Sequence, residues 1–309
     1  MMRRLLVLLS LLILAAVQPA HSAPLKLGVL PAADTIVLHV AADEGLFAKQ
    51  GLEVELVPFQ SALELGAAMR AGALSGHFGD NVLMQNESGS PQAIVATTSH
   101  SSPDNRCFGL VVSPKSKAQT LADLKGKDIA VSSATIIDFL LAQLLQQEGA
   151  APDFLNRQDI RQIPVRLQML LSGQIESALL PEPLVSLVEA KGARTILNDC
   201  KLNTPLAVIA LKRDVLDAPD GAQTVAKFRE ALREAAKCIN ETPDAYRPIM
   251  EAKGLLPKGA SANYTMVRFD MTHTPTGLPS EADIKTFADW MKANRILKKD
   301  PAYGDVVFQ

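Results

Sequence analysis

Short apolar runs followed by helix-like segments recur along most of this 309-residue chain. Leu25–Leu30 reads as a buried strand that Pro31 ends, and a helical pattern then continues to Phe47. Glu53–Phe59 alternates polar and apolar residues, as a half-buried strand does, and Ser61–Arg70 reads as the next helix. Because strands joined by helices run parallel, this order predicts a parallel sheet with helices packed on its faces.

The alternation begins again after a polar break at Ser113–Ser116. In this second half we expect strands at Asp128–Val131, near Ile160–Ile163 and at Glu176–Leu180, with an apolar helix at Ile136–Gln147. A strand at Leu206–Leu211 follows, and beyond it the chain reads as chiefly helical, over residues 222–239, 243–253 and 281–294. The sequence therefore predicts two α/β lobes of similar construction.

The first 23 residues have the three zones of a secretory signal peptide. Arg3 and Arg4 form a basic start, Leu5–Val17 is almost wholly apolar, and small residues up to Ala23 suit cleavage after that residue. The alternative is a membrane anchor, but the run is shorter than the roughly 20 residues that span a bilayer. No cysteine follows the cleavage point to accept a lipid, so we expect a free periplasmic protein.

Polar residues cluster where the predicted strands end. Ligands of open parallel α/β sheets bind beyond the carboxyl ends of the strands, so these positions predict the ligand site. The candidates are Asp34, Thr35, Phe59, Gln60, Ser61, Asp80, Asn81, Thr97 and Thr98 in the first half, and Ser132, Ser133, Thr135 and Glu182 in the second. The alternative for Asp34, Ser61 and Ser132 is that each merely caps a helix. For Asp80 it is also a cap, and for Glu182 an ion pair with a lysine or arginine.

Several segments resemble the periplasmic substrate-binding proteins of ABC transporters of the nitrate/sulfonate/taurine type, which include binding proteins for thiamine-pyrimidine precursors. The resemblance begins at Leu27–Asp34 and Ala41–Phe59, where the chain reads Leu-Gly-Val-Leu-Pro-Ala-Ala-Asp and then Gly-Leu-Phe-Ala-Lys-Gln-Gly-Leu-Glu-Val. It continues at Leu121–Lys127, Leu171–Ala178, Glu182–Pro183 and Asp289–Met291. Each motif is weak alone, but their order along the chain is specific.

The resemblance implies a type II periplasmic-binding-protein fold, an α/β fold of two lobes joined by two crossing strands. Residues 24–112 and 205–309 would form the first lobe and residues 113–204 the second. It also implies a monomer that closes on a small molecule and delivers it to an ABC-type permease. The predicted cleft positions contain no Arg or Lys but include Asp34, Asp80 and Glu182, so a neutral, amphoteric or cationic ligand stays open beside an anion. Phe59 or Phe78 could stack on a ring of the ligand.

An exported or fold-related enzyme is the alternative function. The chain has no cysteine cluster, no metal-binding histidine spacing, no Gly-x-Ser-x-Gly nucleophile motif and no glycine-rich phosphate loop. We therefore expect no catalytic residue, no cofactor and no metal site. The enzyme alternative would draw a general acid and base from Asp34, Asp80 and Glu182. A formal net charge of -2 also makes nucleic acid a poor partner.

The three cysteines are an odd number for an oxidising compartment. Cys107 reads as a small buried apolar residue at the start of a strand. Cys200 and Cys238 are the pair that we would test first for a disulfide, although sequence alone does not determine connectivity.

Overall fold

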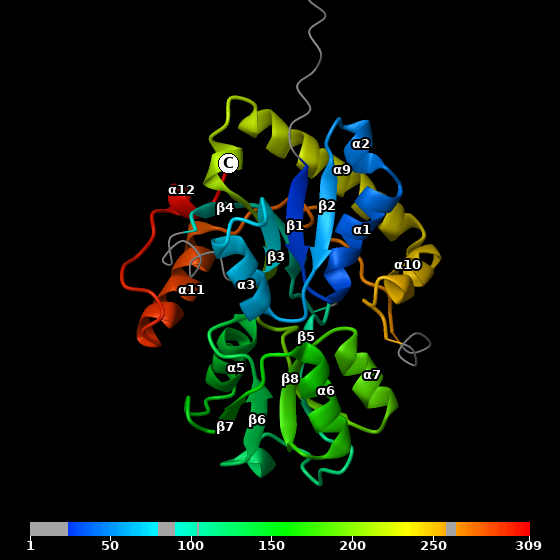
Figure 1. Ribbon diagram of the computed structural model, residues 1–309. Coiled ribbons are helices and arrows are strands. Elements are labelled where there is room, and N and C mark those ends of the chain that lie inside the picture. The colour runs from blue at the N-terminus through cyan, green and yellow to red at the C-terminus, as the bar shows by residue number, and fades with distance from the viewer. Residues whose placement is uncertain (1–23, 80–89, 104, 258–263) are drawn as a thin grey trace, which may run out of the picture.

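The computed structural model describes residues 24–79, 90–103, 105–257 and 264–309 and divides them between two lobes, each built on a five-stranded sheet (Figure 1). The sheet of the first lobe has the strand order β2-β1-β3-β10-β4. Its strands are β1 (Leu25–Val29), β2 (Val54–Pro58), β3 (Gly76–Gly79), β4 (Gln92–His100) and β10 (Pro205–Lys212). β1 pairs in parallel with β2 and β3, whereas β10 is antiparallel to β3 and β4.

The sheet of the second lobe repeats this arrangement in the order β7-β6-β8-β5-β9. Its strands are β5 (Phe108–Val112), β6 (Asp128–Val131), β7 (Asn156–Asp159), β8 (Ser177–Pro181) and β9 (Arg194–Asn198). β6 is parallel to β7 and β8, and β5 is antiparallel to β8 and β9. The predicted fold class, two α/β lobes of the type II periplasmic-binding-protein kind, is confirmed.

Helices cover both sheets, and those of the first lobe come from both ends of the chain (Figure 1). They are η1 (Ala33–Thr35), α1 (Ile36–Asp43), α2 (Leu46–Lys49), α3 (Ala62–Arg70), α8 (Arg213–Leu216), α9 (Gly221–Glu241), η3 (Pro243–Tyr246), α10 (Arg247–Ala252), α11 (Glu281–Ala293) and α12 (Tyr303–Val306). α9 joins the N-terminal part of the lobe through the stacked rings of Phe47 and Phe228, whose centroids lie 5.2 Å apart. The first lobe is therefore discontinuous in sequence.

The second lobe has η2 (Ala122–Leu124), α5 (Ile136–Gln147), α6 (Ile163–Ser172) and α7 (Leu184–Ala190). α5 has the predicted bounds, because Thr135 accepts a hydrogen bond from the Ile137 N–H at its start and an apolar face is buried along its length. An aromatic cluster connects α5 with α11. Phe139 meets Phe287 and Trp290 edge-on, and the last two rings stack on each other.

Two crossing segments connect the lobes, residues 101–107 and 199–204. The backbone N–H of Ser101 donates to the backbone oxygen of Thr204 at 3.0 Å. The Oδ1 atom of Asp199 accepts from the N–H groups of Cys107 at 3.0 Å and Phe108 at 3.1 Å. Burial raises the pKa of Asp199 to about 6, although these hydrogen bonds oppose the rise. One carboxylate thus joins the two crossing segments.

Asp199→Ala should lower the free energy of unfolding by about 2 kcal/mol, because it leaves two N–H groups without their acceptor. Chemical denaturation of the unliganded variant measures this loss. Asp199→Asn is the matched control. Its amide oxygen can still accept both bonds and it removes the buried charge, so it should be at least as stable as the natural protein. Equal losses in the two variants would contradict this role of Asp199.

Three details differ from the sequence analysis. The strand expected near Ile160–Ile163 lies earlier, at β7, and Ile163 begins α6. The predicted boundary after residue 112 assigned β5 to the first lobe, whereas β5 pairs with β8 and β9 of the second sheet. The helix expected to continue to Phe47 is broken at Gly45, whose φ of +69° lies in the left-handed region.

The Cys200–Cys238 pair that the sequence analysis chose to test first does not form a disulfide, and all three cysteines are thiols. Cys238 lies on α9 and packs against the core of the first lobe, whereas Cys200 follows β9 of the second sheet. The pairing was inferred from positions along the chain, and folding places Cys238 against the core of the first lobe but Cys200 in the crossing segment 199–204. In the part of the chain that the structure describes, no helix combines the length and apolar character needed to cross a membrane.

Candidate functional site

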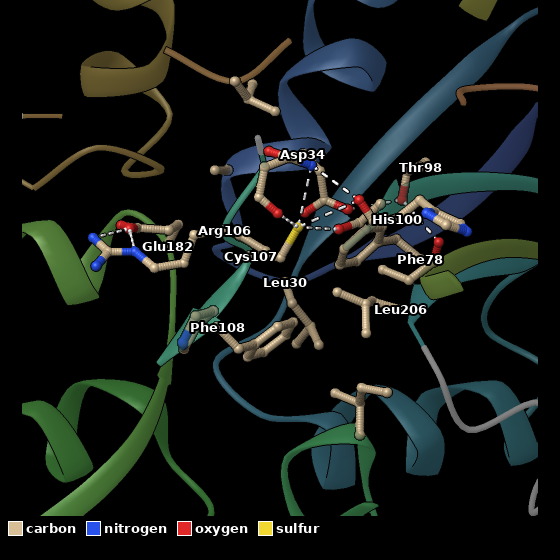
Figure 2. Close-up of a pocket in the computed structure, with 18 of the residues that line it drawn as sticks. Leu30, Asp34, Phe78, Thr98, His100, Arg106, Cys107, Phe108, Glu182 and Leu206 are labelled. Atoms are coloured by element: carbon tan, nitrogen blue, oxygen red, sulfur yellow. Dashed lines mark hydrogen bonds and ion pairs between the residues drawn. The ribbon is translucent and has the colours of Figure 1, made fainter. Parts of the chain in front are cut away.

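A cavity of about 710 Å³ lies between the lobes, at the strand ends of both sheets. The first lobe contributes Leu30, Asp34, Phe78 and Thr98 to its wall, and the second contributes Ser132, Thr135, Pro181 and Glu182. The crossing segments add Arg106 and Cys107, and Tyr264–Asp270 adds a stretch without regular structure. Figure 2 shows several of these side chains around the cavity, with Asp34 and Cys107 near the centre and Arg106 beside Glu182.

Five of the thirteen predicted site residues belong to this wall. They are Asp34, Thr98, Ser132, Thr135 and Glu182. Phe78, one of the two rings expected to stack on a ligand, is also in the wall. These residues come from separate strand ends of two sheets. The cavity therefore lies where the sequence analysis predicted it, beyond the carboxyl ends of parallel strands.

Six other predicted residues lie outside the wall. Ser61 accepts a hydrogen bond from Glu64 N–H and caps α3, next to Gln60, which is exposed. Thr35 donates to the Ala32 backbone oxygen at 2.7 Å. The other three are Phe59, which packs against a small apolar cluster, Thr97, which is buried within β4, and Ser133, whose N–H bonds to Asp159. Asp80 and Asn81 lie outside the described residues.

Asp34 is a buried carboxyl group in the first-lobe wall, with 9% of its surface exposed. It lies in η1, directly after β1, and its Oδ2 accepts a hydrogen bond from Thr98 Oγ1 at 2.8 Å (Figure 2). Burial raises its pKa from 3.8 to about 6, although the Thr98 bond opposes the rise. No ion pair within 4 Å compensates its charge among the described residues.

Glu182 is the centre of an ion-pair cluster in the second-lobe wall. Its Oε1 accepts from Arg106 Nε at 2.7 Å and from Ser186 Oγ, and its Oε2 accepts from the Ser186 N–H. The same guanidinium contacts both oxygens of Glu189, at 3.0 and 2.9 Å. Both carboxylate oxygens of Glu182 are therefore used within the protein. This arrangement matches the ion-pair alternative that the sequence left open for it.

The predicted cleft positions contain no Arg or Lys, whereas the wall includes four arginines that the sequence analysis did not list. They are Arg106, Arg161, Arg166 and Arg268. Arg106 precedes β5, and because β5 is antiparallel to β8, its first residue Phe108 lies opposite Pro181 at the end of β8. The rule considered only carboxyl ends, whereas an antiparallel strand brings its amino end to the same edge.

Arg166 is almost completely buried, with 1% of its surface exposed. It lies on α6, where Nη1 donates to the Ile160 backbone oxygen at 3.0 Å, and Nε has no hydrogen-bond partner among the described residues. Burial lowers the pKa of its guanidinium to about 10, although the charge of Asp159 opposes this. It therefore remains positively charged near neutral pH.

The rest of the wall is largely apolar or neutral. Leu30, Phe78, Phe108, Ile137 and Leu206 provide aliphatic and aromatic surface. Burial and the nearby carboxyl groups of Glu182 and Asp34 raise the pKa of Tyr264, so its hydroxyl stays protonated. His100 stacks on His273 with centroids 5.0 Å apart, and burial together with the His273 charge lowers the pKa of His100. This surface suits a small molecule with an apolar body and a few polar groups.

Cys107 is the thiol in this wall. Ser99 Oγ lies 3.2 Å from its sulfur. Desolvation and the charge of Asp199 raise the pKa of the Cys107 thiol well above its ordinary range, so little thiolate forms near neutral pH. Within the described ranges, no group of three or more His, Cys, Asp and Glu side chains is placed to hold a metal ion.

A family model described as NMT1/THI5 like matches residues 32–246 of this chain. The match includes the wall residues Asp34, Thr98, Arg106, Arg166 and Glu182. It includes every strand of the two sheets except β1, and both crossing segments.

Two curated relatives match part of the chain. One is a Haemophilus influenzae protein provisionally named a thiamine biosynthesis protein, 32% identical over 47% of this chain and 45% of its own length. The other is a Brucella abortus protein provisionally named a binding protein, 30% identical over 59% of this chain and 55% of its own length. The aligned part of the chain thus spans about half the length of these relatives.

Among solved structures, the chain is similar to the alkanesulfonate-binding protein SsuA from Xanthomonas axonopodis pv. citri in complex with MOPS. The TM-score is 0.76 at 20% sequence identity, and the alignment covers 93% of this chain and 98% of that one. At this identity the likeness shows the fold, including its two-lobe architecture.

Proposed function

We propose that this chain, which belongs to the NMT1/THI5-like family, is an extracytoplasmic solute-binding protein that captures a small polar or ring-bearing molecule between its two lobes. The cavity carries this proposal, because both lobes and the crossing segment 101–107 contribute to one wall of apolar surface and few polar groups. The Brucella abortus relative named as a binding protein and the SsuA-like fold support the same function.

The ligand would act by closing the lobes. A molecule that contacts Asp34 and Thr98 on one side and Ser132 and Thr135 on the other binds best when the lobes are closed, so it shifts the population toward that form. The closed form would then deliver the ligand to an ABC-type permease. We place the protein in the periplasm, where residues 1–23 would direct it and then be removed.

An enzyme acting on a small metabolite in the same cavity is the second candidate, favoured by the relative whose name refers to thiamine biosynthesis. Covalent catalysis in this wall would call on Cys107, and its raised pKa keeps it a thiol, which is a weak nucleophile. Glu182 is held by Arg106 and Ser186, which leaves it poorly placed to exchange protons with a substrate. Both observations support binding over turnover.

The test is a thermal-shift screen of the protein lacking residues 1–23 against aminosulfonates, alkanesulfonates, pyrimidines, nucleobase-like rings and polyamines. A compound present at 100 times its dissociation constant should stabilise the folded state by about 2.7 kcal/mol. Recovery of the compound unchanged after incubation is expected of a binding protein, whereas its conversion into product would favour the enzyme.

Trp290 provides a direct readout of closure, because it is the one tryptophan of the sequence and touches Phe139 of the second lobe from α11. Ligand binding should change its fluorescence and reduce the radius of gyration in solution scattering. Trp290→Phe should remove the fluorescence change but preserve the change in radius. A ligand that binds with no change in either signal would contradict lobe closure.

A further inference from the structure

Two buried charges of opposite sign in the cavity wall lack an ionic partner among the described residues. Asp34 in the first lobe has a neutral partner, Thr98, and Arg166 in the second lobe has a neutral partner, the Ile160 backbone oxygen. They enter the cavity from different lobes, on η1 and on α6. Neither charge has an ion pair within 4 Å among the described residues, and the nearest opposing charge to Arg166 is the more distant Asp159, so both are desolvated with little compensation, which is costly in a folded protein.

The other carboxylates and guanidinium groups of the described wall have partners in the protein or reach solvent. Arg106 is paired with Glu182 and Glu189, and Arg161 with Asp159 at 2.7 Å. Asp270 accepts from His273 at 2.6 Å. Arg268 is exposed and donates to a backbone oxygen. In the described wall, a buried charge without an ion pair is therefore found at Asp34 and Arg166 alone.

We infer that the ligand is a small zwitterion, whose cationic N–H group binds Asp34 and whose oxyanion binds Arg166. This inference rests on the proposed binding function and names its ligand class. The oxyanion could be a sulfonate or a carboxylate, since a guanidinium N–H donates to either. An apolar or ring-bearing body between the two charges would contact Phe78, Phe108 and Leu206.

The same arrangement explains how such a ligand would close the lobes. A zwitterion compensates both charges only when the two lobes hold it together, so closure contributes to its binding energy. A compound with one charge would compensate Asp34 or Arg166 and leave the other buried and unpaired. It should therefore bind more weakly and drive little closure.

Three ring compounds of similar size test the inference. 4-(Aminomethyl)benzenesulfonate carries both charges, benzylamine only the cation, and toluene-4-sulfonate only the anion. 4-(Aminomethyl)benzoate is a fourth probe that distinguishes a carboxylate from a sulfonate. Calorimetric titration at pH 8 should give the zwitterions affinities at least about tenfold above those of either singly charged compound. Only the zwitterions should change the fluorescence of Trp290.

Two variants should separate the roles of the charges. Arg166→Met should weaken the zwitterion by about tenfold to a hundredfold and leave benzylamine unchanged or bound more tightly. Asp34→Asn should weaken the zwitterion and benzylamine by a similar factor and improve toluene-4-sulfonate. Arg166→Lys keeps the positive charge and should retain part of the affinity, which guards against a folding defect in Arg166→Met. Arg70→Met, which removes an exposed arginine outside the wall, should change none of these affinities.

Equal affinities for the three ring compounds, or unchanged zwitterion binding in Arg166→Met, would overturn the inference. If these compounds fail while the broader screen yields a ligand that is insensitive to both Asp34→Asn and Arg166→Met, the zwitterion is wrong and the binding function stands. If no compound in either set binds, the proposed function itself fails.

Discussion

Replacing Arg106 by methionine should lower the free energy of unfolding by about 3 kcal/mol, because it leaves a carboxylate buried without its counter-charge. The guanidinium lies 2.6 Å from Glu182, whose side chain is only 10% exposed, and 2.9 Å from Glu189. Methionine retains much of the aliphatic volume, so the loss reports the charge rather than a cavity. Urea denaturation of the unliganded protein at pH 7 measures it.

A double-mutant cycle with Glu182→Gln attributes the loss to the ion pair. Glu182→Gln alone should also destabilise the protein, since its amide cannot replace the charged acceptor of Arg106. Adding it to Arg106→Met should cost little more, because the unpaired carboxylate has been removed. Losses that simply add would show that the two residues act independently and would contradict the ion-pair role. Normal stability together with weakened ligand binding in Glu182→Gln would restore a direct ligand role for this residue.

Replacing Asp34 by asparagine should have the opposite effect and stabilise the unliganded protein. A pKa raised from 3.8 to about 6 corresponds to about 3 kcal/mol of unfavourable free energy for the ionised carboxylate in the folded state. Asparagine removes that charge, and its amide oxygen can still accept from Thr98. Urea denaturation at pH 8 should show the gain, and the same variant should bind the zwitterion more weakly. Higher stability with weaker binding is expected of a charge kept for its ligand.

The stability gained by Asp34→Asn should depend on pH, in a direction that follows from the raised pKa of Asp34. The folded state binds a proton at Asp34 more readily than the unfolded state does. The destabilisation of the natural protein is therefore fully present above about pH 6, shrinks as the pH falls through 6, and vanishes below 3.8. The stability difference between the two proteins should shrink over the same range.

Comparing the natural protein with Asp34→Asn at each pH cancels the contributions of other titrating groups to the stability difference. The raised pKa of Asp199 and the pKa of His39, which burial and the charge of Lys253 lower to about 4, act alike in both. A difference that stays constant between pH 8 and pH 5, or a less stable Asp34→Asn protein, would contradict this account of Asp34.

Local sequence patterns were sufficient where burial follows the periodicity of an element. α5 begins after its Thr135 cap and ends where predicted, because its apolar residues recur on one helical face. The same reliance on apolar residues misplaced β7. Its residues Asn156–Asp159 are mostly exposed, so the strand depends on backbone pairing with β6, and the neighbouring apolar residues Ile160 and Ile163 gave a false signal.

The sequence by itself determined the alternation of strands and helices, the two-lobe fold and the edge at which the cavity lies. It also identified Asp34 as a candidate site residue. All of these predictions use patterns of residues that are close together in the chain. Only the tertiary structure decided that Glu182 is neutralised by Arg106 and that the buried Arg166 has no ion pair among the described residues. Whether a charge is compensated depends on distances between segments that are remote in sequence, and residue order does not contain those distances.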